Sequence, residues 1–262
     1  MSAAASRLAG RTILVTGGGS GIGAAIARGL AAESANVVLA GRSADSVEAM
    51  AASIVAEGGA ASAVRVDVTS RDDVREGIEY AVAEFGRLDV YFNNVGSAKP
   101  MRFLDVTEDD FEESLRVNAL SVLIGTQEAG KRFIAQGGGG KVVNTGSVAG
   151  RSGTPNLAPY AAAKSAVVSL TQAAARALAP HGITVNAVSP GVVDTPLWAH
   201  LDEELREMGA EGSGFQALTE RILLGRPAVP DDIVPTALFL ASADSDYITG
   251  QVLAVDGGML LV

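Results

Sequence analysis

The chain lacks cysteine, and its 262 residues contain no apolar run long enough to cross a membrane. Without cysteine there is no disulfide, no thiolate nucleophile and no thiolate ligand for a metal ion. A membrane-spanning helix needs roughly 18 or more consecutive apolar residues, and residues 1–10 lack the apolar segment of a signal peptide. These absences predict a cytoplasmic protein without a membrane segment.

Basic side chains are also scarce. Lys and Arg number 20 against 30 Asp and Glu, which gives a formal charge of −10. Binding of nucleic acid needs clustered Lys and Arg against the phosphates, so this balance argues against a nucleic-acid partner. The His and carboxylate side chains show no metal-ligand spacing, and we therefore expect no catalytic metal.

Short apolar runs alternate with helical patterns along the whole chain. The expected strands are residues 13–16, 37–40, 63–68, 88–93, 141–145, 184–189 and 252–255. The expected helices include residues 24–33, 72–85, 108–135, 160–178 and 231–241. This alternation predicts an α/β fold, a Rossmann-like doubly wound parallel sheet of about seven strands with helices on both faces. Ligands of such sheets bind beyond the carboxyl ends of the strands.

A glycine-rich turn follows the first predicted strand. It reads Gly17-Gly18-Gly19-Ser20-Gly21-Ile22-Gly23 and leads into an alanine-rich helical stretch. Strand, glycine turn and helix in this order present backbone N–H groups and the positive end of a helix dipole to an anion. Glycine permits both positive φ and the close approach of a pyrophosphate. The alternative is a flexible loop, which the strand and helix on either side disfavour.

Tyr160 and Lys164 lie four residues apart in a predicted helix, which places the phenol and the ammonium on one face. A free phenol ionises only near pH ~10. A nearby positive charge lowers that pKa and so suits a tyrosine that exchanges a proton with a substrate. The alternative is a surface lysine one turn away from a packed tyrosine.

Several motifs occur together in one order along the chain: Thr16-Gly17-x-x-x-Gly21-x-Gly23, Asn93-Asn94-Val95-Gly96, Asn118, Ser147, Tyr160-x-x-x-Lys164 and Pro190-Gly191. This arrangement resembles the short-chain dehydrogenase/reductase family in its single-domain branch, over residues 8–262. The resemblance implies that residues 1–262 form one dinucleotide-binding and catalytic domain. It also implies hydride transfer between a nicotinamide cofactor and a carbonyl or secondary alcohol. Val95 stands where the family usually has alanine.

The resemblance assigns four catalytic roles. Tyr160 exchanges the proton with the substrate oxygen, and Ser147 hydrogen-bonds that oxygen. Lys164 lowers the pKa of the phenol and binds the nicotinamide ribose, while Asn118 holds a water behind the lysine. Singly, Asn118 is equally explained as a helix-bending asparagine and Ser147 as an ordinary loop serine.

The resemblance also implies a set of cofactor contacts: Gly17, Ser20, Gly21, Ile22, Gly23, Asp67, Val68, Asn94, Gly96, Tyr160, Lys164, Pro190, Gly191, Val193 and Thr195. Asp67 matches the family's adenine contact, and its alternative is a carboxylate that caps a turn after a strand. Asn94 and Gly96 match residues beside the riboses.

The end of the second predicted strand bears on the choice of cofactor. An acidic residue there usually bonds the ribose 2′-hydroxyl and repels a 2′-phosphate. Here Gly41 removes the repulsion, Arg42 offers a guanidinium for phosphate, and Ser43 adds a hydroxyl. These residues favour NADP, with NAD as the alternative. The competing explanation is that Arg42 is only solvated and that Ser43 or Asp45 caps the next helix.

The substrate is less well specified. The family forms a lid after Pro190-Gly191, here residues 192–228, with Trp198, Leu201, Phe215 and Leu218. The stretch 181–198 resembles bacterial polyol and diol dehydrogenases, whereas the overall layout and residues 247–258 equally resemble 3-oxoacyl-(acyl-carrier-protein) reductases. A regulator that binds NADP without turnover is a third possibility. The retention of all four catalytic residue types favours an enzyme.

The predicted helix 160–178 is rich in alanine, and the chain ends in an apolar tail, residues 259–262. Small side chains allow close helix packing between subunits, and an apolar tail favours burial. Family members commonly form tetramers, so the expected assembly is a homotetramer, with a dimer as the alternative.

Overall fold

Seven apolar segments pair as parallel strands within residues 6–261, the part of the chain that the computed structural model describes. They are β1 (Thr12–Thr16), β2 (Asn36–Gly41), β3 (Ala60–Arg65), β4 (Val90–Asn93), β5 (Gly140–Thr145), β6 (Ile183–Pro190) and β7 (Val252–Val255). Their order across the sheet is β3-β2-β1-β4-β5-β6-β7. The predicted doubly wound sheet is confirmed, and the chain reverses its direction of winding between β1 and β4.

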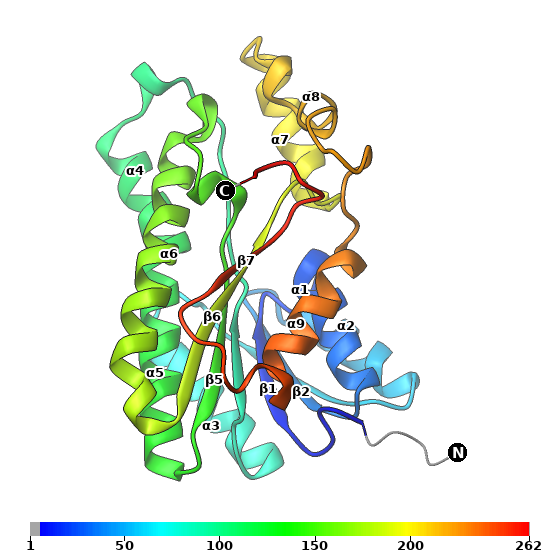
Figure 1. The fold of residues 1–262 in the computed structure, drawn as a ribbon. Coiled ribbons are helices and arrows are strands. Elements are labelled where there is room, and N and C mark those ends of the chain that lie inside the picture. The colour runs from blue at the N-terminus through cyan, green and yellow to red at the C-terminus, as the bar shows by residue number, and fades with distance from the viewer. Residues whose placement is uncertain (1–5, 262) are drawn as a thin grey trace.

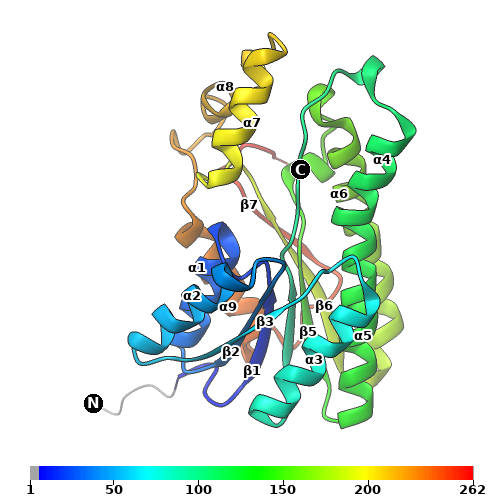
Figure 2. The same ribbon diagram turned by 180° about the vertical axis from the view of Figure 1, so that it is seen from behind.

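Helices cover both faces of the sheet (Figures 1 and 2). They are α1 (Gly21–Ala32), α2 (Ala44–Ala56), α3 (Arg71–Phe85), α4 (Glu108–Leu115), α5 (Ser121–Gln136), α6 (Ala158–Leu178), α7 (Pro196–Glu207), α8 (Phe215–Thr219) and α9 (Pro230–Ala241). Helices α1, α2 and α9 bury their apolar sides in one core, whereas α3, α5 and α6 share the other.

Strand β1 shows why the sheet separates two cores. Successive side chains of a strand point to opposite faces. Ile13 and Val15 therefore lie in the core beneath α1, while Leu14 lies in the core beneath α3 and α5. All three are buried because helices cover both faces, which explains the continuous apolar run in the sequence.

Two predicted strands differ from the observed ones by two or more residues at an end. β3 ends at Arg65 rather than at residue 68, because the chain turns there to place Asp67 at the edge of the sheet. β4 begins at Val90 rather than at residue 88. The side chain of Gln136 binds both the N–H and the carbonyl of Leu88, at 3.3 and 2.5 Å, and so occupies groups that a strand would use.

The single helix predicted for residues 108–135 is wrong, because a π-helical turn at Arg116–Leu120 separates α4 from α5. Side chains compete here for the backbone carbonyls of the helix. Asn118 Nδ2 donates to the carbonyl of Ser114 at 3.0 Å, and Ser121 Oγ donates to that of Val117 at 2.6 Å. Such one-turn insertions are frequent at functional sites.

The carboxyl ends of the strands lie at one edge of the sheet, where the connecting loops rise above it. Figure 1 shows the lid helices α7 and α8 on one side of this edge and α4 and α6 on the other, with the C-terminal tail between them. In the part of the chain that the structure describes, none of the helices is both long and apolar enough to span a membrane.

Candidate active site

A cavity of about 490 Å³ opens at the carboxyl edge of the sheet, between the strands and the lid. Most of the predicted site residues line it: Gly17, Ser20, Gly21, Ile22, Gly23, Asn94, Gly96, Ser147, Tyr160, Lys164, Pro190, Gly191, Val193 and Thr195. The structure therefore brings together segments that are up to 178 positions apart, from Gly17 to Thr195. Five predicted residues, Arg42, Ser43, Asp67, Val68 and Asn118, do not line it.

The glycine turn forms an anion cradle at the start of α1. Gly17 has a φ of +66°, and a Cβ at Gly23 would lie 2.1 Å from the carbonyl oxygen of Gly17, so neither position accepts a larger residue. Ser20 makes no side-chain capping bond, and the first turn of α1 carries no acidic residue. Its N–H groups are therefore available to an anion from the cavity. This arrangement fits a pyrophosphate.

Ser147, Tyr160 and Lys164 form the floor of the cavity. Lys164 is almost fully buried, and its Nζ donates to the carbonyl of Thr145 at 2.8 Å. The same Nζ lies 5.7 Å from the centroid of the Tyr160 ring, as the i, i+4 spacing on α6 predicts. Ser147 caps the short turn Val148–Gly150, accepting from the N–H of Ala149 at 3.2 Å. The loop after β5, which carries Ser147, and helix α6, which carries Tyr160 and Lys164, thus line the same cavity.

The predicted lowering of the Tyr160 pKa is wrong for this geometry. Burial raises the pKa of Tyr160, and a hydrogen bond with the Ser147 side chain only partly opposes that rise. Burial also lowers the pKa of Lys164, to about 8. Both shifts have the same cause, since a low-dielectric site disfavours whichever form of a group is charged.

Asn118 lies behind the floor rather than in the cavity. It is fully buried, its Oδ1 accepts from the N–H of Ser97 at 3.0 Å, and its Nδ2 donates to the Ser97 carbonyl at 2.9 Å. A Cβ at Gly96 would lie 3.1 Å from Asn118 Oδ1 and 3.3 Å from Lys164 Nζ. Gly96 therefore separates these two groups at close range. Asn118 also helps to form the π-helical turn, as the helix-bending alternative proposed.

Asn94 joins three strands at the edge of the cavity. Its N–H donates to Thr16 Oγ1 at 2.9 Å, its Nδ2 donates to the Thr16 carbonyl at 3.1 Å, and its Oδ1 accepts from Thr145 Oγ1 at 3.4 Å. Thr16 and Thr145 are not among the predicted site residues. The signal for both was present, because each is a hydroxyl residue at the last position of a buried strand.

Arg42, Ser43, Asp67 and Val68 lie farther along the same edge, beyond β2 and β3. Ser43 caps α2, accepting from the N–H of Ser46 at 3.4 Å, which is the capping alternative. Hydrogen bonds from the backbone and side chain of Thr69 lower the pKa of Asp67, and the charge of Arg42 adds to this effect. Asp67 therefore caps a turn, and Arg42 lies close enough to act on it.

The segment 192–228 closes on itself at its base. The backbone N–H of Asp194 donates to the carbonyl of Ala228 at 2.8 Å, and the backbone N–H of Ala228 donates to the carbonyl of Val192 at 2.9 Å. Trp198 and Phe215 meet edge to face, 5.6 Å between ring centroids, and Trp198 but not Phe215 lines the cavity. Leu201 and Leu218 line it as well.

Among the further lining residues are Arg221, Met259 and Leu260, which no sequence motif places at the cavity. Met259 and Leu260 belong to the apolar tail that was expected to favour burial, and they line the cavity of their own chain. Val262 lies outside the described residues. Within residues 6–261 no three His, Cys, Asp or Glu side chains gather as metal ligands would.

A phosphate cradle and a Tyr–Ser–Lys floor that share one cavity at the switch point of a parallel sheet define a class, the dinucleotide-dependent dehydrogenases. Comparison with known proteins supports this class. Residues 17–260 match a family model described as enoyl-(acyl carrier protein) reductase.

Similar proteins match nearly the full chain. L-2,3-butanediol dehydrogenase of Corynebacterium glutamicum is 41% identical, over 95% of this chain and 98% of its own. A 3-oxoacyl-(acyl-carrier-protein) reductase of Thermotoga maritima is 35% identical, over 97% and 100%. A Beutenbergia cavernae protein, described as a candidate NAD(P)-dependent gluconate 5-dehydrogenase, was solved with NADP at low occupancy. It is 40% identical, with a TM-score of 0.86 over 98% and 99% of the two chains.

The chain belongs to the short-chain dehydrogenase/reductase family. It is an NAD(P)-dependent oxidoreductase that transfers hydride between the nicotinamide cofactor and a carbonyl or secondary alcohol, as the sequence motifs predicted.

Proposed function

We propose that this protein is an NADP-preferring dehydrogenase/reductase of small polyols and hydroxyketones, with Tyr160 as general acid and base. One observation carries the proposal. The phenol of Tyr160 opens into the same cavity as the anion cradle of the glycine turn, with Ser147 and Lys164 beside it. A cofactor held by the cradle and a substrate oxygen at Tyr160 therefore share one enclosed space.

Bound in this cavity, the nicotinamide cofactor supplies or accepts the hydride. Tyr160 gives its phenolic proton to the carbonyl oxygen as the carbon is reduced, and takes it back when the alcohol is oxidised. Ser147 hydrogen-bonds the same oxygen. Lys164, held against the Thr145 carbonyl, places a positive charge beside the phenol when it is protonated. Asn118 positions the backbone behind that lysine.

Preference for NADP rests on the end of β2. Gly41 is the last residue of this strand, where an acidic side chain would repel a 2′-phosphate. Arg42 follows it, exposed, and forms no hydrogen bond or ion pair with the described residues, so its guanidinium is available to a phosphate. The NADP bound by the Beutenbergia cavernae protein agrees with this choice.

A pair of variants tests the cofactor preference. A Cβ at Gly41 would lie 2.9 Å from Val47 Cγ1, a movable methyl group, so both Gly41→Asp and Gly41→Ala should fold. Gly41→Asp should shift the ratio of kcat/KM for NADPH over NADH toward NADH, on the order of tenfold or more, because a carboxylate repels the 2′-phosphate. Gly41→Ala adds the same methyl contact without charge and should keep the preference. Equal ratios in the two variants would contradict the proposal.

The substrate class follows the relatives. The Corynebacterium glutamicum relative is a butanediol dehydrogenase, and a 38% identical relative from Agrobacterium fabrum is a galactitol 2-dehydrogenase. An acyl-carrier protein, in contrast, is acidic and needs a basic docking patch. Three cations could contribute to such a patch, and each already has a partner. Lys131 pairs with Glu128 at 2.7 Å, Arg132 pairs with Glu79, and Arg176 donates to the carbonyl of Gln172 at 3.2 Å. A small hydroxyketone or polyol is therefore the better substrate class.

The direct test is the loss of absorbance of NADPH and NADH in parallel with hydroxyketones, diketones, ketoses and a 3-oxoacyl thioester. Oxidation of NADPH by hydroxyketones or ketoses supports the proposal. Turnover confined to the thioester would favour the acyl-carrier-protein reductase. Tight NADPH binding without turnover of any compound would favour a regulator.

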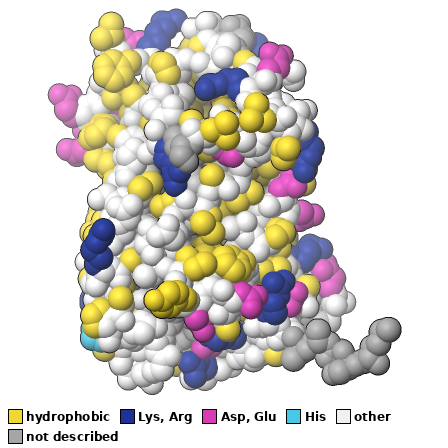
Figure 3. Space-filling model, viewed as in Figure 1, with side chains coloured by type: hydrophobic (Ala, Val, Ile, Leu, Met, Phe, Trp, Pro, Cys, Tyr) yellow, Lys and Arg dark blue, Asp and Glu magenta, His cyan; other side chains and the backbone are white. Residues whose placement is uncertain are grey.

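Assembly and location complete the proposal. Figure 3 shows apolar side chains gathered across the middle of the face that carries β7, and Tyr247, just before that strand, is fully exposed. Exposed apolar surface of this kind favours contact with further copies. We infer a cytoplasmic homotetramer in which residues 1–262 act as one domain with a lid at residues 192–228. A monomer mass by light scattering would contradict the assembly.

A further inference from the structure

The charged side chains that line the cavity are all positive. Among the described residues they are Lys164 and Arg221, and no Asp or Glu lines the cavity. This is the reverse of the chain as a whole, whose formal charge is −10. A cleft lined by one sign of charge raises the local concentration of ligands of the opposite sign. The cavity is therefore built for anions.

The two cations differ in what they bind. Lys164 is buried and already donates to the Thr145 carbonyl at 2.8 Å, so it belongs to the floor. Arg221 is exposed to the cavity, and its guanidinium forms no hydrogen bond or ion pair with the side chains and backbone that the structure describes. Its five N–H donors are left to a ligand.

The backbone of Arg221 is held in place at the rim of the cavity. Its N–H donates to the Leu218 carbonyl at 3.1 Å, and the next residue, Ile222, is buried. A Cβ at Gly257 would lie 2.6 Å from Ile222 Cγ2, and Leu224 donates to the Gly257 carbonyl at 3.1 Å. This part of the lid is therefore anchored, through Ile222 and the N–H of Leu224, to the tail that follows β7.

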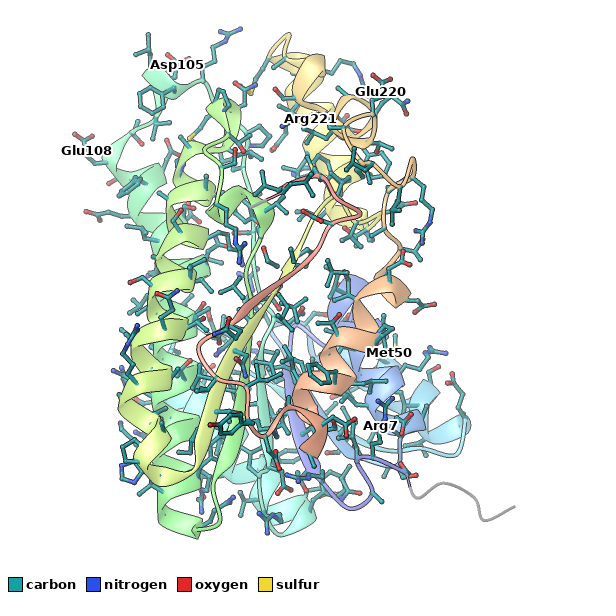
Figure 4. All side chains as sticks on the ribbon, viewed as in Figure 1. Arg7, Met50, Asp105, Glu108, Glu220 and Arg221 are labelled. Atoms are coloured by element: carbon teal, nitrogen blue, oxygen red, sulfur yellow. The ribbon has the colours of Figure 1, made fainter. Side chains whose placement is uncertain are left out.

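Other charged residues of the lid face elsewhere. Arg226 forms a two-point ion pair with Asp232, at 2.6 and 2.8 Å. Arg206, on the last turn of α7, is exposed but does not line the cavity. Figure 4 shows Arg221 on the side of the lid that faces the cleft, whereas the neighbouring Glu220 lies on the outer side. Arg221 is the lid arginine that reaches the substrate space.

The lid beside Arg221 is anchored at a different part of the sheet from the phosphate cradle. The cradle follows β1, whereas Ile222, the residue after Arg221, packs on the tail that follows β7, and β4, β5 and β6 lie between those two strands in the sheet. A planar guanidinium binds a carboxylate through two parallel hydrogen bonds, which fixes orientation as well as charge. At the rim, such a contact would orient a substrate whose reacting carbon lies at Tyr160.

We propose that Arg221 binds a carboxylate of the substrate, so that the enzyme prefers hydroxy or oxo acids, such as sugar acids, to neutral polyols of the same length. The inference rests on the proposed function and narrows its substrate class. Arg221 determines specificity in this account, and Tyr160 still performs the proton transfer.

The test compares an aldonate with the alditol of equal chain length, with NADP+ as oxidant. The wild type should show the higher kcat/KM for the aldonate. Arg221→Gln should lower the aldonate-to-alditol ratio of kcat/KM by on the order of tenfold or more, mainly through KM, because a charge-assisted pair is lost. Arg221→Lys keeps the positive charge but not the two-point geometry of the guanidinium. Its aldonate-to-alditol ratio of kcat/KM should lie between those of the wild type and Arg221→Gln. Arg206→Gln, a matched loss of a lid cation outside the cavity, should keep the wild-type ratio.

Three outcomes would overturn the inference. The wild type could oxidise both compounds without preferring the aldonate, which leaves the proposed function intact. Arg221→Gln could keep the wild-type ratio, or could keep it while weakening NADPH binding, which would assign Arg221 to the cofactor. Turnover of neither compound, together with none of the neutral hydroxyketones, would refute the proposed function as well.

Discussion

The floor of the cavity, formed by Ser147, Tyr160 and Lys164, and the lid, residues 192–228, are held in very different ways. Beneath the floor runs a buried chain of amides and hydroxyls. Asn93 Nδ2 donates to Asn144 Oδ1, and Asn144 Nδ2 donates to Thr171 Oγ1, both at 2.9 Å. The lid instead leaves Leu223 and Leu224 more than two-thirds exposed, at 71% and 74%.

Few contacts tie the lid to the opposite wall. Asn156 Nδ2 donates to Ser213 Oγ at 3.0 Å, and Arg102 Nη2 donates to the Met208 carbonyl at 2.8 Å. Both bonds involve partly or fully exposed groups, whose net contribution is small. Under the proposed function, the chemistry is fixed by preorganised, buried groups, whereas substrate choice rests on a segment that can change at little cost in stability.

The largest effect should come from the floor. Tyr160→Phe removes the proton donor and keeps the ring, so kcat should fall by roughly 10²–10⁴-fold, the usual contribution of general acid–base catalysis. The Kd for NADPH, measured by fluorescence titration, should stay within about threefold. A variant that keeps a tenth or more of the wild-type rate would show that another group donates the proton.

The buried amides should dominate stability. Asn144→Leu deprives Asn93 and Thr171 of partners in the core, and should lower the free energy of unfolding by about 1–3 kcal/mol. Asn156→Leu, the matched change at the lid contact, should cost less than about 1 kcal/mol. Urea denaturation of both variants decides the point, and equal losses would mean that floor and lid are equally coupled to folding.

Lys164 makes stability depend on pH. Its pKa in the folded protein is about 8, below the ordinary 10.5, so the folded state releases the proton first. The free energy of unfolding should therefore rise between pH 7.5 and 9.5, on the order of 1–2 kcal/mol. Lys164→Met should flatten this slope in parallel urea titrations. A wild-type stability that falls over the same range would show that the ammonium is stabilised by a charge partner.

The smallest effect should come from the lid. Trp198→Ala removes an aromatic contact that is worth about 1 kcal/mol or less at a partly exposed site. Its KM for the carbonyl substrate should rise severalfold while the Kd for NADPH stays unchanged. Steady-state kinetics with one carbonyl substrate and with each nicotinamide cofactor in turn separates an effect on substrate binding from an effect on cofactor binding. A loss of NADPH binding would mean that Trp198 serves the cofactor.

The sequence predicts the regular parts of this molecule well, because strands buried on both faces leave apolar runs and the glycine turn has its own spacing. Prediction from the sequence fails where contacts between distant residues determine the local structure or the pKa of a group. At the break at Arg116–Leu120, Asn118 binds not only Ser114 within its own helix but also Ser97, 21 positions away. The raised pKa of Tyr160 depends on burial by the assembled cavity, which the i, i+4 spacing with Lys164 does not reveal.

Among the lid residues, the sequence singled out Trp198, Leu201 and Leu218, which line the cavity, but it missed Arg221. Trp198 is conspicuous as the single tryptophan of the chain, whereas Arg221 is one of many arginines until the fold brings it to the cavity. Residues that act through tertiary contact carry no local signature. This is why motif spacing identifies the catalytic floor and leaves the substrate side open.

The most direct test of the difference between floor and lid is a single-turnover experiment. Enzyme in excess over NADPH is mixed with a saturating hydroxyketone, and the decay of NADPH fluorescence is followed for the wild type, Tyr160→Phe and Trp198→Ala. The account predicts decay at least about 100-fold slower for Tyr160→Phe and within about threefold of wild type for Trp198→Ala, because saturation hides a defect in substrate binding. Near-normal decay in Tyr160→Phe, or a collapse in Trp198→Ala, would contradict it.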